Sequence, residues 1–301
     1  MTHGFLILTH FPPEKIYHQV SRLQAPNRYF YIHFDKKMAI DNDDAFYKKL
    51  LSQENVTILT NRIDVQWGSL KIIDATLALI KEALSNKTID YLHLFSGECL
   101  PVKSAKYIDD YFIKHQGTEF MDRFVMPEKA PNHSITYDRI NKYHLHDYFN
   151  PRSPKINDVV IKHVNSIFRK LQKIARPAGL YRRYPEGFPT LYAGSQWWSL
   201  SYAACSYIID YVHQHPEFYR RFRHTQATDE FFFQTIMMNG PFKEKVVNES
   251  LRFISFNNAI SSPNALTMEY LPDIADENKL FGRKFTDASK ELLEYLERNV
   301  Y

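Results

Sequence analysis

Five short apolar segments alternate with helix-like segments in the first 126 residues, and this order constrains the fold more than any other feature. The apolar segments read as strands, and the segments between them carry apolar residues at helical spacing. The strands are expected at 4–9, 28–35, 56–59, 90–95 and 119–121, and the helices at 13–23, 44–51 and 69–83. Strands that alternate with helices form mostly parallel sheets with helices on both faces. The sequence therefore predicts an α/β fold with a mostly parallel central sheet.

Polar residues follow these predicted strands at the edge where ligands bind in such sheets. Leu8 lies near the end of the first strand, and Asp35 ends the second. The strand at 90–95 leads into Ser96-Gly97-Glu98, a turn whose glycine allows a ligand to approach the backbone closely. Because open α/β sheets bind ligands beyond the carboxyl ends of their strands, we expect a ligand site at this edge.

Residues 127–190 interrupt the alternation, because proline and charged residues become frequent and strand signals fade. We therefore expect one catalytic domain over residues 1–301, with a nucleotide-binding half at 1–126, an inserted basic and helical segment at 127–190, and an acceptor-side and catalytic half at 191–301. The segment 159–175 is amphipathic and basic. It fits a core-packed helix with one solvated face, a helix on an anionic membrane surface, or a helix that holds an acceptor.

Two carboxylates open a predicted helix near residue 230. Thr228 is expected to cap it, which would place Asp229 and Glu230 in its first turn, before three phenylalanines. The helix dipole favours an ionised carboxylate there, and an ionised carboxylate at a fixed place beside an apolar wall suits a general base. Acidic residues are common in first turns for the same electrostatic reason, so this pattern alone does not identify a base.

Three other patterns have two interpretations each. The tandem Trp197-Trp198 beside Gly194-Ser195-Gln196 fits a platform for a sugar ring or buried sheet packing. His144 and His146 alternate as metal ligands can, but we expect them to be solvated or salt-bridged, since no third ligand is evident. Asp41-Asn42-Asp43 matches the metal-binding DxD pattern, but its place before a short surface helix favours an ordinary loop.

Composition excludes several classes of protein. The 301 residues carry a formal net charge of +4, which is too small to indicate a nucleic-acid-binding protein. Cys99 and Cys205 fit neither a disulfide framework nor a metal site, so reduced thiols in a cytoplasmic protein are expected. No signal peptide and no membrane-spanning apolar run is visible.

Taken together, the motifs resemble those of the core-2/I-branching N-acetylglucosaminyltransferase and peptide O-xylosyltransferase family, in the same order and over nearly the whole chain. The residues that carry the resemblance are Asp35, Val65-Gln66-Trp67-Gly68, Ser96-Gly97-Glu98, Gly194-Ser195-Gln196-Trp197-Trp198, Asp229-Glu230 and Arg283-Lys284. The resemblance implies a GT-A fold, a UDP-sugar donor, inversion at the anomeric carbon and no requirement for a metal.

The resemblance also implies roles for single residues. Glu230 falls on the family's catalytic base. The nucleotide-binding residues that it implies are Leu8, Asp35, Val65, Gln66, Trp67, Arg252, Arg283 and Lys284, of which Arg252 and Lys284 contact the diphosphate. The residues expected to bind the substrate sugars are Ser96, Gly97, Glu98, Gln196, Trp197 and Trp198.

The chemistry agrees with these roles, because an inverting transferase needs a base for the acceptor hydroxyl and positive charge on the departing diphosphate. Arginine and lysine can supply the charge that a metal supplies elsewhere, at about 3–4 kcal/mol for each well-placed group. Gln196 departs from the acidic residue of some xylosyl-transferring members, which weakens a xylose-specific interpretation. N-acetylglucosamine transfer is therefore the first expectation. Pentosyl transfer and a non-catalytic glycan- or nucleotide-binding module remain alternatives.

The family's secreted members have a cysteine pattern, an anchor and a stem that are not visible here. We therefore expect a bacterial cytoplasmic enzyme. The basic stretch at 159–183 suggests the further hypothesis of a lipid-linked or other glycan acceptor at the inner surface of an anionic membrane.

Overall fold

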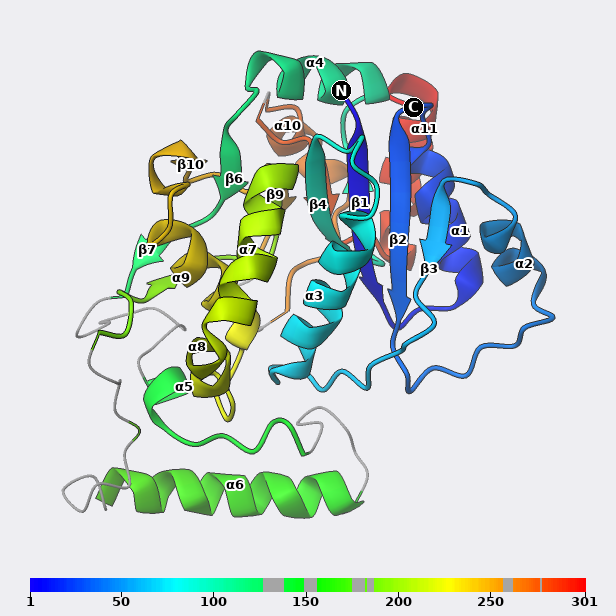
Figure 1. The fold of residues 1–301 in the computed structure, drawn as a ribbon. Helices are drawn as coiled ribbons and strands as arrows, with labels where there is room; N and C mark the ends of the chain where they lie inside the picture. Colours follow the sequence, from blue (N-terminus) through cyan, green and yellow to red (C-terminus); the bar gives the residue numbers. More distant parts are fainter. Residues whose placement is uncertain (127–137, 149–155, 175–181, 183–186, 257–261, 277) are drawn as a thin grey trace.

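A computed structural model describes residues 1–126, 138–148, 156–174, 182, 187–256, 262–276 and 278–301. A seven-stranded sheet lies at its centre, in the order β10-β6-β9-β4-β1-β2-β3 (Figure 1). Strands β3, β2, β1 and β4 are parallel to one another, and β9 is antiparallel to both of its neighbours. The mostly parallel α/β sheet predicted from the sequence is thereby confirmed. The strands are β1 (His3–Thr9), β2 (Arg28–Phe34), β3 (Val56–Ile58), β4 (Tyr91–Ser96), β6 (Glu119–Met121), β9 (Trp198–Ser201) and β10 (Val246–Val247).

The register of the central strands brings the predicted ligand-binding residues to one edge. Thr9 lies opposite Phe34, and Leu8 lies opposite Ser96. Just past the strands, the Asp35 amide donates to the Thr9 carbonyl at 2.7 Å, and the Gly97 amide donates to the Leu8 carbonyl at 3.2 Å. The chain therefore turns outward from β2 and β4 at neighbouring points of the carboxyl edge.

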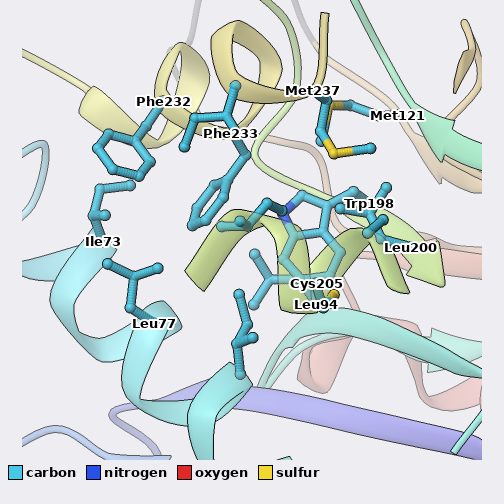
Figure 2. Packing of buried hydrophobic residues seen from close by; sticks show 14 of the residues in the cluster. Ile73, Leu77, Leu94, Met121, Trp198, Leu200, Cys205, Phe232, Phe233 and Met237 are labelled. Carbon is cyan, nitrogen blue, oxygen red and sulfur yellow. The ribbon is translucent and has the colours of Figure 1, made fainter. Parts of the chain in front are cut away.

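Helices cover both faces of the sheet because its central strands are apolar on both sides. On one face Leu6 and Leu94 pack with residues of α3 (Lys71–Ala83), α7 (Tyr202–Gln214) and α9 (Phe232–Met238). Figure 2 shows Leu94 among the residues of these helices. On the other face Phe5 and Phe95 pack with residues of the helices α1 (Pro13–Leu23), α2 (Ala45–Leu51) and α4 (Ala105–Lys114). Alternate residues of each strand thus enter different cores.

Two smaller sheets attach to this centre. In the first, β11 (Arg252–Ile254) is parallel to β12 (Phe281–Arg283), which pairs antiparallel with β5 (Leu100–Pro101). The second pairs β7 (Phe124–Val125) with β8 (Tyr192–Ala193). The other elements of the described residues are α5 (Asp138–Asn141), α6 (Ile156–Ile174), α8 (Pro216–Arg221), α10 (Leu271–Ile274), α11 (Lys290–Asn299) and the 3-10 turns η2 (Thr228–Glu230), η3 (Lys243–Lys245), η4 (Met268–Tyr270) and η5 (Asp287–Ser289).

Two predicted helix starts are wrong by a few residues. Thr228 does not cap a helix: residues Thr228–Glu230 form the 3-10 turn η2, and α9 begins only at Phe232. The Thr228 side chain is buried, and its hydroxyl donates to the Thr225 carbonyl at 3.4 Å instead of accepting from an amide. The helix expected from residue 69 likewise begins later, since α3 starts at Lys71 after the cap position Leu70. Asp229 and Glu230 consequently lie in a tight turn before the helix.

The predicted inserted segment is described only in part, as α5, α6 and a few residues beside them. The described part of α6 contradicts the core-packed interpretation, because Ile167, Leu171 and Ile174 are 60%, 55% and 77% exposed. Among the α6 side chains that the structure describes, those of Asn165 and Gln172 are buried. Figure 1 shows the helix apart from the central sheet, next to α5. In the described residues, no helix has the length and apolar character needed to cross a membrane.

Candidate active site

The turn after β4 gathers four of the residues predicted from sequence. Arg283 Nε donates to Ser96 Oγ at 3.1 Å, and an Arg283 Nη2 lies 3.8 Å from Glu98 Oε2. The Arg283 guanidinium also stacks over the Trp197 ring, 5.0 Å from its centroid. These residues come from β4, β12 and the segment before β9, so only the tertiary structure joins them.

Close backbone packing explains two glycines in these turns. A Cβ at Gly97 would lie 2.6 Å from Thr9 Oγ1, and a Cβ at Gly194 would lie 1.8 Å from the Asp122 carbonyl oxygen. The Gly194 amide donates to the Glu230 carbonyl at 2.9 Å, and Gln234 Nε2 donates to the Ser195 carbonyl at 2.7 Å. The glycine-serine turn and the turn that carries Glu230 are therefore held against each other.

Glu230 has a guanidinium partner that the sequence did not indicate. Arg139 Nη1, from α5, donates to Glu230 Oε2 at 2.6 Å, and the two side chains are 18% and 31% exposed. Burial raises the pKa of Glu230, while Arg139 acts in the opposite direction. Burial and the neighbouring Glu230 raise the pKa of Asp229 as well. Glu230 thus combines higher basicity than a free carboxylate with a fixed position and partial exposure, which a general base requires.

The segment that carries Trp67 is hydrogen-bonded to the residue that precedes the Glu230 turn. The Ala227 amide donates to the Gly68 carbonyl at 2.9 Å, and Ala227 has the left-handed φ of 53° that precedes η2. Trp67 is 39% exposed, and its ring lies 6.0 Å edge-on from that of His146. An exposed indole therefore lies on a segment that is bonded to the turn of the candidate base.

A lysine missed by the sequence analysis links Asp35 to the Val65 segment. Lys37 Nζ donates to Asp35 Oδ2 at 3.1 Å, to Asp64 Oδ1 at 2.8 Å and to the Val65 carbonyl. Gln66 Nε2 also donates to Asp64 Oδ1, at 2.8 Å. These hydrogen bonds lie where β2 ends, and they connect Asp35 to the Val65–Gln66 segment, both of which the resemblance implies in nucleotide binding. The lysine two residues after Asp35 is a weak signal, because a helical or loop lysine is ordinarily solvated.

The two cations expected at the diphosphate occupy different environments. Arg252 is 4% exposed, and it donates to Ser199 Oγ at 2.6 Å, to the Trp198 carbonyl at 2.8 Å and to the carbonyls of Leu94 and Ser250. Lys284 is half-buried, and its Nζ donates to Ser262 Oγ at 3.1 Å. Arg252 therefore ties β11 to β4 and β9, whereas the Lys284 side chain is only half-buried and its ammonium has one hydrogen-bond partner, Ser262, among the described residues.

A cavity of about 270 Å³ lies beside Arg252. Asp122, Ser195, Glu249 and Lys279 contribute to its lining. Lys279 Nζ pairs with Glu249 Oε2 at 2.7 Å, and burial raises the pKa of Asp122. The cavity is polar, and Ser195 connects its wall to the glycine-serine turn beside Glu230.

Several predicted residues are buried. Trp198 is fully buried and packs against Phe233, so its ring has no surface for substrate (Figure 2). Gln196 is half-buried, and Trp197 is 7% exposed. His144 and His146 are expected to be solvated or salt-bridged, and their burial makes the solvated alternative wrong.

The remaining expectations concern a loop and the cysteines. The Asp41-Asn42-Asp43 triplet is exposed before α2, and Asp43 pairs with Lys48 at 2.7 Å, as an ordinary loop does. Cys99 and Cys205 are both free and buried.

A family model described as Core-2/I-Branching enzyme matches residues 4–279. Xylosyltransferase oxt of Drosophila melanogaster is 24% identical over 95% of this chain and 32% of its own length. Xylosyltransferase oxt of Drosophila pseudoobscura pseudoobscura is 22% identical over 90% and 30%, and the xylosyltransferase of Ciona intestinalis is 21% identical over 91% and 31%.

The chain thus spans about a third of the length of these curated relatives. The family match covers most of the chain, including the turn after β4, the glycine-serine turn and the turn that carries Glu230. The mixed α/β fold with a mostly parallel sheet agrees with the GT-A type that the motifs imply. The protein belongs to the Core-2/I-Branching enzyme family.

Proposed function

We propose that this protein is an inverting glycosyltransferase that moves a sugar, N-acetylglucosamine in the first instance, from a UDP-sugar to a hydroxyl of a glycan acceptor without a metal ion. The observation that supports it most is the Glu230 turn: a half-exposed carboxylate, fixed by Arg139, is bonded through the backbone to the glycine-serine and Trp67 segments. The family membership supports the same class of reaction.

In the proposed reaction Glu230 accepts the proton of the acceptor hydroxyl while that oxygen attacks C1 of the donor sugar. The new C1–O bond forms on the face opposite the bond to the diphosphate, which breaks with its electron pair and leaves UDP. One displacement of this kind inverts the anomeric carbon. The departing oxygens need fixed positive charge, and Lys284 and Arg283 are the accessible cations of the predicted set.

We assign Asp35 and the Val65–Trp67 segment to the nucleoside. Lys37 donates hydrogen bonds to Asp35 and to the Val65 carbonyl, and thereby holds these two residues together at the carboxyl edge of the sheet. Ser96, Glu98, Gln196 and Trp197 are assigned to the sugars. Arg252 is assigned a supporting role under the diphosphate site, since its donors are directed at backbone carbonyls and Ser199.

Pentosyl transfer is the second candidate, because the three relatives are xylosyltransferases. Both candidates use the same base and the same leaving group, so they are distinguished by which UDP-sugar the protein uses as a donor. A binding module without turnover is the third candidate, and it predicts UDP binding with no release of UDP from any donor.

The acceptor that we propose is a free or lipid-linked glycan, and the location that we propose is the cytoplasm, at the inner surface of an anionic membrane. The two buried free thiols are compatible with a reducing compartment.

The test is UDP release from a panel of UDP-sugars in EDTA, with and without simple glycosides as acceptors. We expect one donor to be used, and Glu230→Gln to lower its rate about 100-fold to 10,000-fold. Lys284→Ala is expected to lower the rate as well, whereas the exposed Glu244→Gln and Lys243→Ala serve as matched controls. Full activity of Glu230→Gln would refute the base, and turnover only after Mn²⁺ is added would refute the metal-free mechanism.

A further inference from the structure

Helix α6 is attached to the rest of the protein by its polar side. Asn165 Oδ1 accepts from the Leu145 amide at 3.1 Å. Gln172 Oε1 accepts from the Tyr143 amide at 2.6 Å, and Gln172 Nε2 donates to the Tyr143 carbonyl at 3.0 Å. Asn165 and Gln172 are 5% and 1% exposed and lie seven residues apart, on one line of the helix. Their amides pair with the segment that follows α5, so the orientation of α6 is fixed by hydrogen bonds.

The apolar stripe of α6 faces outward. Its members recur every three or four residues, as expected for one face of a helix. They are Val160 (54% exposed), Val164 (51%), Ile167 (60%), Leu171 (55%) and Ile174 (77%). A helix at the surface of a globular protein normally buries such a stripe, and an apolar patch on display marks a surface for a protein or membrane partner.

Positive charge accompanies this stripe. The sequence of α6 has four Lys or Arg residues and one Asp. Lys162 and Lys170 are exposed, and neither makes an ion pair among the contacts of the described residues. An apolar stripe beside lysines fits the boundary between headgroups and acyl chains, since the apolar residues enter the boundary while long lysine side chains reach anionic headgroups. A protein partner of this chain's own kind would instead bring the same positive charges together.

Helix α6, with its apolar stripe, lies on the same side of the molecule as the carboxyl edge of the sheet. Figure 1 shows α6 on the side toward which β2 points, beyond the carboxyl edge of the sheet. The segment that holds α6 also carries Arg139, the partner of Glu230. In addition, the His144 amide donates to the His224 carbonyl at 2.8 Å, and the Gln226 amide donates to the Arg139 carbonyl at 2.9 Å. Helix α6 is therefore connected to the candidate base through hydrogen bonds that are joined by short stretches of the chain.

We propose that α6 lies in the surface of an anionic lipid bilayer, with Val160, Val164, Ile167, Leu171 and Ile174 in the acyl boundary and Lys162 and Lys170 at the headgroups. The helix does not cross the bilayer; it binds parallel to it and turns the carboxyl edge of the sheet toward lipid. This inference deepens the proposed location at an anionic membrane, and it rests on the exposure and charge of α6 and not on the proposed reaction. Lipid binding and sugar transfer can therefore fail separately.

The test is flotation of the 301-residue protein with vesicles of phosphatidylcholine alone or with an equal part of phosphatidylglycerol. We expect binding to the anionic vesicles that weakens as salt is added. Ile167→Glu with Leu171→Glu should weaken it about 100-fold or more, because two apolar side chains leave the boundary and two negative charges enter it. Lys162→Glu with Lys170→Glu should weaken it about tenfold or more.

Leu51→Glu on α2 is the matched control, because Leu51 and Leu171 are equally exposed, at 55%. It should float like the wild type, and circular dichroism should show that all variants remain folded. Failure of the wild type to float, equal binding to neutral vesicles, or equal loss with Leu51→Glu would overturn the proposal. A dimer in sedimentation equilibrium that Leu171→Glu dissociates, without vesicle binding, would assign the stripe to a second copy of the chain. The release of UDP from donor in solution should be unchanged in the α6 variants.

Discussion

Arg139 Nη1 lies 2.6 Å from Glu230 Oε2, so a residue of the segment between the two halves of the chain holds the candidate base. The two residues are 91 positions apart, and no local pattern indicates the pair. Their contact gives the carboxylate a fixed direction, and it sets the basicity of Glu230 through two opposed effects. Burial raises the pKa of Glu230, and the guanidinium lowers it.

The first prediction concerns this pair. Arg139→Gln removes the charge that stabilises ionised Glu230, so the pKa of Glu230 should rise above its wild-type value. A base acts in its deprotonated form, and the acidic limb of the pH profile of kcat/KM should therefore move to higher pH. Arg139→Lys should keep most of the wild-type profile. An acidic limb that stays in place in Arg139→Gln, with only KM altered, would show that Arg139 acts on substrate binding and not on the base.

The second prediction separates the two predicted diphosphate cations. Arg252→Leu leaves the buried carbonyls of Leu94 and Trp198 without their donor, so the free energy of unfolding should fall by about 3 kcal/mol or more. Lys284→Ala should leave the free energy of unfolding within about 1 kcal/mol of the wild type, because the half-buried Lys284 side chain makes one hydrogen bond, to Ser262 Oγ, among the described residues. Urea titration measures both. Equal stability of Arg252→Leu and wild type would contradict the supporting role.

The third prediction concerns two buried histidines. His3 Nδ1 and His93 Nε2 lie 2.9 Å apart, and the other His93 ring nitrogen lies 2.8 Å from Ser199 Oγ. Burial lowers the pKa of both residues below 6.5, and that of His93 well below it. The unfolded chain therefore binds more protons than the folded protein as pH falls below about 6.5. Stability is fully present above that pH and is lost below it, by up to about 1.4 kcal/mol per pH unit for each histidine.

Urea titrations at several pH values measure this loss. His93→Gln keeps a hydrogen-bonding side chain but cannot titrate, so the acid loss should become less steep, whereas the exposed His213→Gln should keep the wild-type slope. An unchanged slope in His93→Gln would show that His93 does not carry the effect.

The fourth prediction concerns Gly194. A methyl group there would lie 1.8 Å from the Asp122 carbonyl oxygen, so Gly194→Ala must displace backbone that also bonds to the Glu230 turn. We expect a loss of more than about 3 kcal/mol of stability or, if the chain adapts, a loss of transfer that exceeds the loss of UDP binding. Gly117→Ala is the matched comparison for space, since nothing lies within 4 Å of its added Cβ, although its positive φ adds strain. Wild-type transfer by Gly194→Ala would contradict the role of this contact.

Much of the fold could be predicted because its first half obeys local rules. The helix at Pro13–Leu23 and the strand at Arg28–Phe34 lie where apolar spacing placed them, since buried strands and half-buried helices differ in period. The start of the helix near Thr228 could not be predicted in this way. The sequence does not show whether the hydroxyl of Thr228 caps a helix or is buried. In the structure it donates to the Thr225 carbonyl, so it does not cap.

The sequence by itself determined the α/β order, the turn chemistry at Gly97 and Gly194, and the motif series that indicates the family, because these depend on residues close together in the chain. Only the tertiary structure decided which residues meet across it. Arg139 meets Glu230, and Lys37 meets Val65. The side chains of Trp198 and Arg252 are buried. Helix α6 is attached through Asn165 and Gln172. Helical periodicity predicts that a helix has an apolar stripe, but the packing of the helix against the rest of the protein decides whether that stripe faces the core or the solvent.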